Sequence, residues 1–79
     1  MTVQVLFFGA AAEWTGVRKL DVPMEDNATA ADVFDRLTGE YAGLKDRKLK
    51  LAVNQQYATG DEVIRDGDEL AIFTAVSGG

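Results

Sequence analysis

The chain has 79 residues, of which 47% are hydrophobic and 27% charged, and its formal net charge is −5. This composition indicates one small globular domain and excludes a disordered chain. The sequence contains neither cysteine nor histidine, so disulfides, thiolate metal sites, a cysteine nucleophile and the commonest general base are excluded. These absences argue against a self-contained hydrolase or metalloenzyme. The acidic charge disfavours nucleic acid and anionic membranes as partners and favours a basic protein surface.

The N-terminal segment has no basic stretch and no long apolar run. We therefore expect neither a signal peptide nor a transmembrane span, and a cytoplasmic protein.

Residues 2–8 alternate as a β-strand does. The odd positions are Val3, Val5 and Phe7. Gln4 marks the even positions as the solvent side, so we expect Leu6 and Phe8 to be apolar groups on the outer face of a sheet.

Residues 9–16 form a connection with room for one helical turn, in which Trp14 is expected to cover the edge of the core. Residues 17–22 read as a second strand that stops at Pro23, because proline cannot donate to a sheet ladder. The short connection makes these two strands a hairpin.

A helix is predicted to follow a polar loop at residues 24–28. Thr29 is its expected N-cap, with Asp32 three residues later in a variant of the capping box. Gly43 is expected as the C′ residue that ends it. The apolar stripe has helical spacing and consists of Ala30, Val33, Phe34, Leu37 and Tyr41.

Residues 48–53 alternate between leucine or valine and a second face that carries Lys48, Lys50 and Ala52. Lysines on such a strand are a usual guard against edge-to-edge pairing. A turn at residues 54–56 and a short strand at residues 57–58 are expected next. Val63 and Ile64 are expected to anchor the following loop in the core.

A turn at Asp66-Gly67-Asp68 precedes a last strand over residues 70–76. Its core face is predicted to carry Leu70, Ile72, Thr74 and Val76. The order of elements is two strands, a helix, then two or three strands, which predicts an α+β fold with a mixed sheet of four to five strands on one main helix. This is the order of the β-grasp of ubiquitin. We expect a domain over residues 1–76 and a flexible Ser-Gly-Gly tail over residues 77–79.

If the first and last strands are neighbours, apolar side chains gather on the outer face, where no segment remains to cover them. The residues we expect to bind a partner there are Leu6, Phe8, Tyr57 and Phe73, beside Ala71. The alternative is a set of scattered surface apolar residues without a role.

Five acids lie between residues 61 and 69. Their spacing lacks the regular oxygen ligands of a calcium loop, so we expect solvated turn acids and no metal site. Docking on a basic partner is the alternative.

The C-terminal glycines give a thin stem without side chains, which could enter a narrow active site of another protein. These glycines end one of four notable motifs: Val-Leu-Phe-Phe at residues 5–8 with Glu13 and Gly16, Ala-Val-Asn-Gln at 52–55, Asp-Gly-Asp-Glu-Leu at 66–70 and Val-Ser-Gly-Gly at 76–79. Together the four motifs resemble the small subunit of molybdopterin synthase, a ubiquitin-like sulfur carrier of the MoaD and ThiS type.

This resemblance implies that an E1-like, ATP-using enzyme adenylates the carboxylate of Gly79 and that a sulfur donor protein converts it to a thiocarboxylate. Ser77 and Gly78 would thread the loaded end into the large subunit, where a cyclic pterin precursor receives the sulfur. The chain would be a non-catalytic carrier with no tightly bound cofactor.

The sequence departs from the family pattern at two places. Thr74 and Ala75 stand where two prolines are common, which implies a looser tail. Ala12 stands where an arginine is frequent. The alternatives are a protein modifier joined through Gly79 to lysines, a sulfur carrier for thiamine or tRNA thiolation, and a plain interaction domain.

Overall fold

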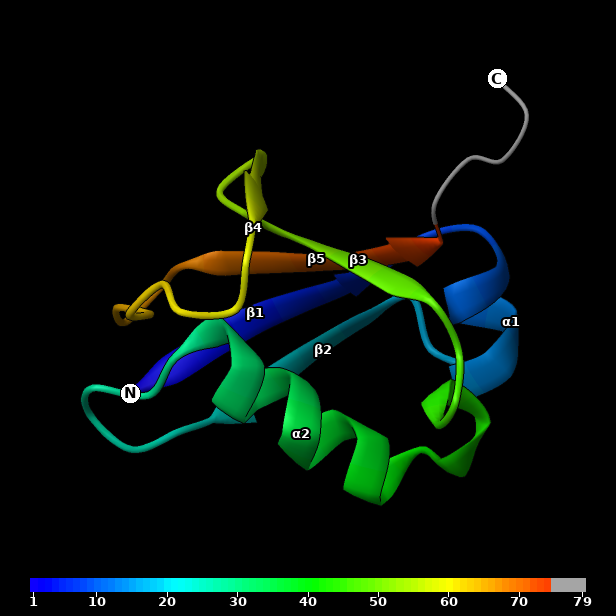
Figure 1. The fold of residues 1–79 in the computed structure, drawn as a ribbon. Helices are drawn as coiled ribbons and strands as arrows, with labels where there is room; N and C mark the ends of the chain where they lie inside the picture. Colours follow the sequence, from blue (N-terminus) through cyan, green and yellow to red (C-terminus); the bar gives the residue numbers. More distant parts are fainter. Residues whose placement is uncertain (75–79) are drawn as a thin grey trace.

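The computed structural model describes residues 1–74 (Figure 1). The predicted end of the last strand, Ala75 and Val76, and the predicted tail, residues 77–79, lie outside the described residues. The elements are β1 (Thr2–Phe7), α1 (Ala10–Thr15), β2 (Lys19–Pro23), α2 (Ala30–Glu40), the 3₁₀ helix η1 (Ala42–Leu44), β3 (Leu49–Val53), β4 (Gln56–Ala58) and β5 (Glu69–Thr74).

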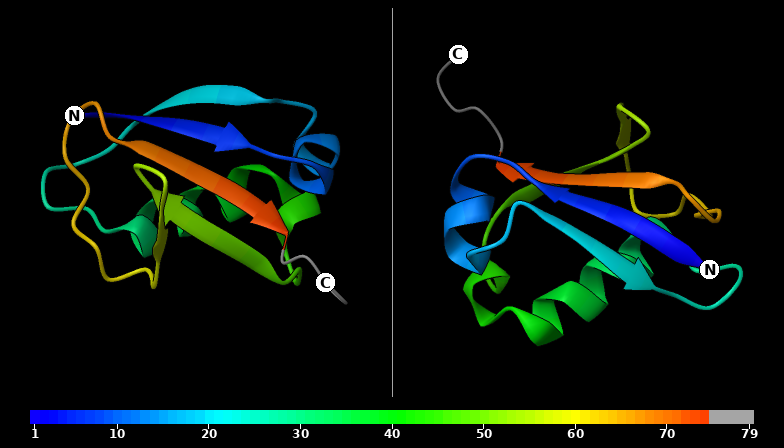
Figure 2. Two further views of the ribbon diagram at one scale, coloured as in Figure 1. Left: turned by 90° about the horizontal axis from the view of Figure 1, so that it is seen from above. Right: turned by 180° about the vertical axis from the view of Figure 1, so that it is seen from behind.

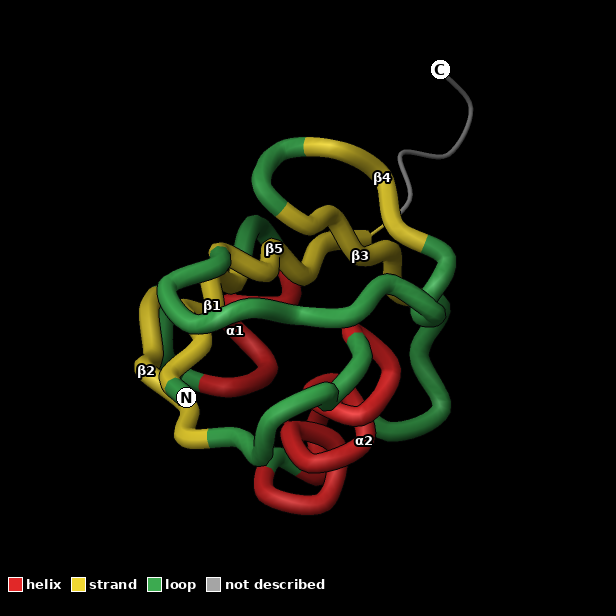
Figure 3. Tube along the Cα trace, turned by 90° about the vertical axis from the view of Figure 1, so that its left-hand side faces the viewer, coloured by secondary structure: helices red, strands yellow, loops and turns green. Residues whose placement is uncertain are grey.

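The five strands form one mixed sheet in the order β2-β1-β5-β3-β4. β5 is parallel to β1, whereas the β1–β2, β3–β5 and β3–β4 pairs are antiparallel. The sheet and α2 form two layers, best seen in Figure 3, and the left view of Figure 2 looks onto the sheet with α2 behind it. This architecture confirms the predicted α+β fold and the predicted neighbourhood of the first and last strands.

The core lies between the sheet and α2. Val3 and Val5 of β1, Leu70 and Ile72 of β5, and Leu37 of α2 have no exposed surface. The predicted inward faces of the first and last strands are therefore correct over the described residues, because alternate positions of a strand face opposite sides of the sheet.

The start of α2 is fixed by the predicted capping box. The Thr29 hydroxyl accepts from the Asp32 backbone N–H at 3.2 Å, and the Asp32 carboxylate accepts from the Thr29 N–H at 2.9 Å. Two donors that a helix N-terminus leaves without intrahelical partners are thereby satisfied.

The predicted end of this helix was wrong. α2 stops at Glu40, and Tyr41 in an extended conformation is its C-cap. Gly43 lies inside η1, and a Cβ there would come within 2.5 Å of the backbone oxygen of Trp14. Close packing of two backbones, not a left-handed cap, therefore requires glycine at residue 43.

β2 also differs from the prediction, since it begins at Lys19 and includes Pro23. Met1 and Met24 exchange both backbone hydrogen bonds, so the next pair, Thr2 and Pro23, is a non-hydrogen-bonded one. The nitrogen of Pro23 therefore faces the open edge of the sheet, where a missing donor breaks no ladder bond.

The connection after β1 contains the predicted helical turn as α1. Trp14 is half-buried and packs against the core, as expected of a residue covering its edge. The guanidinium of Arg47 lies 3.8 Å from the centre of its ring and donates to the carbonyl of Gly43 at 2.9 Å. These contacts fasten α1 to the connection that leads into β3.

Asn54 and Gln55 form the turn between β3 and β4, both with positive φ, as a type I′ turn requires. Gln56 already belongs to β4, so the turn is one residue shorter than predicted. Ile64 is 1% exposed and anchors the next loop, whereas Val63 is 55% exposed and does not. Across residues 1–74, no helix has the length and apolarity needed to span a membrane.

Candidate functional site

The four residues predicted to bind a partner lie on the sheet face opposite α2. Leu6 of β1 is level with Ala71 of β5, which is level with Ala52 of β3, which is level with Tyr57 of β4. These residues form one row across the sheet, since paired positions point to the same side. We name Leu6, Phe8, Ala52, Tyr57, Ala71 and Phe73 the outer-face patch.

The aromatic members of this patch are fixed by the sheet and by each other. The rings of Tyr57 and Phe73 are 5.9 Å apart at an angle of 49°. The backbone N–H of Phe8 donates to the carbonyl of Ile72 at 3.0 Å, which holds residue 8 beside β5. Tyr57 is 83% exposed and Phe8 is 52% exposed. A cluster of large aromatic side chains that stays exposed to solvent is typical of a protein interaction site.

A shallow hollow of about 260 Å³ opens on the patch between Ala52, Gln55, Tyr57 and Phe73. The sequence predicts Ala52 on the outer side of its strand but does not join it to the patch. It likewise predicts Lys50 only as a guard of the strand, whereas Lys50 is level with Phe73. The missing information was that β3 lies directly beside β5, which no local pattern reveals.

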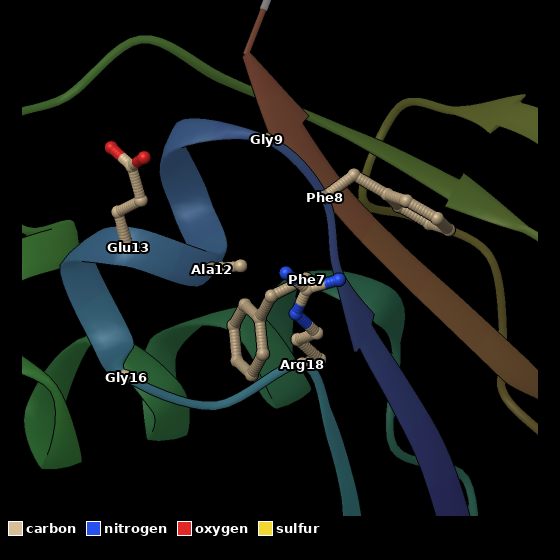
Figure 4. A pocket seen from close by; sticks show the side chains of 7 residues that line it. All are labelled: Phe7, Phe8, Gly9, Ala12, Glu13, Gly16 and Arg18. Carbon is tan, nitrogen blue, oxygen red and sulfur yellow. The ribbon is translucent and has the colours of Figure 1, made fainter.

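A second hollow, of about 470 Å³, lies where β1 passes into α1 (Figure 4). In Figure 4, Phe8 projects from the end of β1 toward β5, and Glu13 projects from α1 away from Phe7. Because Phe8 belongs to both surfaces, this hollow continues the outer-face patch. Its lining residues are Phe7, Phe8, Gly9, Ala12, Glu13, Gly16 and Arg18.

The predicted tail chemistry at Gly79, with Ser77 and Gly78 as the threading segment, lies outside the described residues. The structure does describe where the strand leading to them ends. Thr74 is level with Leu49 at the start of β3, and β5 contacts α1. Phe73 is thus six residues before Gly79 and in the outer-face patch. Six extended residues reach about 20 Å, so one partner could contact the patch and the last residues together.

Two of the five acids at residues 61–69, Glu62 and Asp68, serve the local turns. The Glu62 carboxylate accepts from the backbone N–H groups of Thr59 and Gly60, both at 2.8 Å. Hydrogen bonds from these backbone groups, that of Thr59 first, lower the pKa of Glu62 below its ordinary value.

Asp68 plays the same part before β5. Its carboxylate accepts from the Arg65 N–H at 2.8 Å and from the Asn54 side chain at 3.1 Å, and the bond from Arg65, followed by that from Asn54, lowers its pKa. These contacts agree with the interpretation of turn acids. Within residues 1–74, no three acidic, histidine or cysteine side chains converge as metal ligands.

The sequence of the chain is similar to those of proteins named as sulfur carriers. The "Molybdopterin synthase sulfur carrier subunit" of Arabidopsis thaliana is 34% identical over 79 residues, which cover 98% of this chain and 82% of the relative. This similarity confirms the predicted resemblance to the molybdopterin synthase sulfur carriers.

Solved structures share the fold over its whole length. The crystal structure of SAMP1 from Haloferax volcanii has a TM-score of 0.88 and 29% identity, with all of both chains covered. A chain in the crystal structure of the BexX/CysO complex from Amycolatopsis orientalis has a TM-score of 0.67 and 29% identity, with 98% of this chain and 99% of that chain covered. The β-grasp fold predicted from the order of elements is thereby confirmed.

One family model matches almost the entire chain. The match runs from residue 5 to residue 79. It therefore includes both the outer-face patch and the C-terminal glycines, the two features that the sequence singled out. The chain belongs to the ThiS family.

Proposed function

We propose that this chain is the sulfur carrier subunit of a molybdopterin synthase and that the α-carboxylate of Gly79 carries the sulfur. The observation that carries the proposal is the family match, which extends through Gly79. The named relative from Arabidopsis thaliana supports the choice of pathway.

The residue inventory fits a carrier. The sequence offers no cysteine thiol to hold sulfur and no histidine to transfer protons. A terminal thiocarboxylate needs neither, because the carboxyl group itself becomes the attachment point. The acid–base groups and the ATP site then belong to partner proteins, and this chain binds no cofactor of its own tightly.

The proposed cycle has three steps. In an E1-like partner, the carboxylate of Gly79 attacks the α-phosphorus of ATP, and pyrophosphate leaves. A sulfide equivalent from a sulfur donor protein then displaces AMP and forms the thiocarboxylate. In the large subunit, the thiocarboxylate sulfur attacks a carbon of the cyclic pterin precursor, and the oxygen substituent of that carbon leaves. Water then hydrolyses the acyl–sulfur bond, which leaves the sulfur on the pterin and restores the carboxylate. No net oxidation is needed when the donor supplies sulfur at the level of sulfide.

The outer-face patch is the docking surface in this proposal. Phe73 and Phe8 hold the carrier on its partner while residues 75–79 extend into the active site. Both the adenylating enzyme and the large subunit receive the same tail, so we expect them to use the same patch and to compete for one carrier molecule.

Intact mass spectrometry of the protein from its native cells tests the proposal. We expect a species heavier by the difference between one sulfur and one oxygen, which alkylation with iodoacetamide traps. Only unmodified protein, in cells that are making the cofactor, would refute the carrier function.

A protein modifier is the second candidate, because the chain is similar over its full length to the small archaeal modifier protein SAMP1 of Haloferax volcanii. It shares the adenylation step and differs in the acceptor, a lysine amine. Peptides in which Gly79 is joined to lysine in digests of cell extracts would favour this candidate. A plain interaction domain predicts that removal of Gly78 and Gly79 has no effect on the cells.

A further inference from the structure

The charged side chains are unevenly divided between the two ends of the sheet. β5 is parallel to β1 and antiparallel to β3, so the end of β5 lies near the connection after β1 and the connection before β3 (Figure 1). We name this the tail end of the molecule; it comprises Thr74, residues 8–19 and residues 40–50. It carries six of the eight lysine and arginine residues and three of the thirteen acids, which gives +3. The two cations and ten acids elsewhere give −8.

All six tail-end cations are exposed: Arg18, Lys19, Lys45, Arg47, Lys48 and Lys50. None of them forms a salt bridge within residues 1–74, where the one ion pair joins Arg36 to Glu40. Arg47 stacks on Trp14 and donates to the Gly43 carbonyl, and the charges of the other five are available to another molecule.

The surface that carries these cations is held in place. The stacking of Arg47 on Trp14 and the close approach of Gly43 to the Trp14 backbone pin the connection before β3 against α1. Lys50 is level with Phe73 on the outer face, so the basic surface begins where the outer-face patch ends. An apolar patch bordered by exposed cations matches a protein surface with an apolar pocket bordered by carboxylates.

We propose that the tail end docks on an acidic protein surface that surrounds the entrance to the active site receiving Gly79. This inference rests on the proposed function, since it is the delivery of the tail that requires this end of the carrier to face the partner. The net charge of −5 alone predicts a basic partner surface. At the tail end, which must contact the partner, the distribution of the charges instead favours an acidic partner surface.

Charge separation of this kind also orients the carrier before contact. An acidic partner attracts the tail end and repels the other end, so encounters in which the tail leads are favoured. Charges at the rim of an interface mainly change the association rate, and salt screens them over about 10 Å at 0.1 M ionic strength. The distinguishing property is therefore an association rate that depends on salt and on the end of the molecule that is altered.

Two charge reversals of equal size test the proposal. Lys48→Glu alters the tail end, and Arg65→Glu alters the opposite end; both side chains are exposed, and neither donates a side-chain hydrogen bond within residues 1–74. Association of each variant with the E1-like enzyme and with the large subunit from the same genome is followed by stopped-flow fluorescence between 20 mM and 1 M salt. Circular dichroism verifies folding.

We expect Lys48→Glu to slow association with at least one of these partners by about threefold to tenfold at low salt and to approach the wild-type rate at 1 M salt. Arg65→Glu should change the rate less than twofold. Equal effects of the two variants, or faster association of Lys48→Glu with both partners, would overturn the proposal. The proposal would also be overturned if Lys48→Glu associated with both partners at the wild-type rate but no longer bound inorganic pyrophosphate in a titration. The cations would then bind a small anion and not a protein surface. Failure of the wild-type protein to become thiocarboxylated would instead refute the proposed function.

Discussion

Neighbouring residues of β5 allow folding and partner binding to be separated by one pair of substitutions. Ile72 points into the core and has no exposed surface. Phe73 points to the outer face, where its ring contacts that of Tyr57. We predict that Ile72→Ala reduces stability and that Phe73→Ala reduces binding, although the two residues are adjacent in the same strand.

The magnitudes follow from burial. Truncation of a fully buried isoleucine to alanine costs about 2–5 kcal/mol. A domain of 79 residues has a total stability of only about 4–12 kcal/mol. At about 4–8 °C per kcal/mol for a domain of this size, Ile72→Ala should lower the melting temperature by about 10 °C or more.

Phe73→Ala removes an aromatic anchor from the middle of the patch but leaves no cavity in the core. Loss of such an anchor commonly costs about 2 kcal/mol or more of binding free energy. This corresponds to a roughly 30-fold larger dissociation constant, since 1.4 kcal/mol is a factor of ten. The melting temperature should stay within a few degrees of the wild-type value, because the side chain is already partly in solvent.

The assays are thermal unfolding by circular dichroism and calorimetric titration of the large subunit. The two variants control for each other, because both shorten an apolar side chain to alanine in the same strand. If folded Phe73→Ala bound the large subunit with wild-type affinity, the outer-face patch would not be the docking surface. A loss below about 0.5 kcal/mol for Ile72→Ala would contradict the burial of this strand face.

Three further changes test the tail, the packing of η1 and the turn acids. Deletion of Gly79 should abolish thiocarboxylate formation, seen by intact mass, and leave the melting temperature unchanged, because the last buried core residue within residues 1–74 is Ile72; thiocarboxylate on the truncated protein would refute the terminal carrier. Gly43→Ala should destabilise the fold by about 1–3 kcal/mol in urea unfolding, because the new Cβ would meet the Trp14 backbone oxygen at 2.5 Å. Its control, Gly39→Ala in α2, meets nothing within 4 Å and should be neutral or stabilise by up to about 1 kcal/mol; equal effects of the two would contradict the proposed packing. The lowered pKa of Asp68 implies that its hydrogen bonds stabilise the fold above the unfolded-state pKa of about 3.9 and are lost as pH falls through the lower folded pKa. Asp68→Asn should therefore lower the melting temperature at pH 7 and flatten its decline below pH 4, and an unaltered pH profile would contradict this assignment.

Local patterns predicted the features that local chemistry determines. The alternation of Val3 and Val5 with Gln4 gave the two faces of β1, and the pair of Thr29 and Asp32 gave the start of α2. In both cases the physical cause lies within a few residues of its effect: the pleat of a strand and the free N–H groups of a helix terminus.

The misplaced features depend on contacts between segments distant in sequence. The sequence predicts Gly43 as a helix cap, whereas its role follows from Trp14, 29 positions earlier. The sequence predicts that the strand stops at Pro23, whereas the place of Pro23 at the open edge of the sheet makes it acceptable within the strand. Ala52 joined the outer-face patch only once β3 was placed beside β5.

The position of β5 in the sheet connects the fold to the proposed delivery of the tail. β5 lies between β1 and β3, so its end is flanked on one side by the passage from β1 into α1 and on the other by the basic start of β3 (Figure 1). A tail that followed an edge strand would have open solvent on one side, where a partner could bind it without contacting the domain. From a central strand, the chain continues beyond Thr74 between two surfaces that one partner can contact together. These surfaces carry the aromatic side chains of the outer-face patch and the cations of the tail end. The parallel pairing of β1 with β5 thus allows a partner to recognise the domain while it binds the terminus.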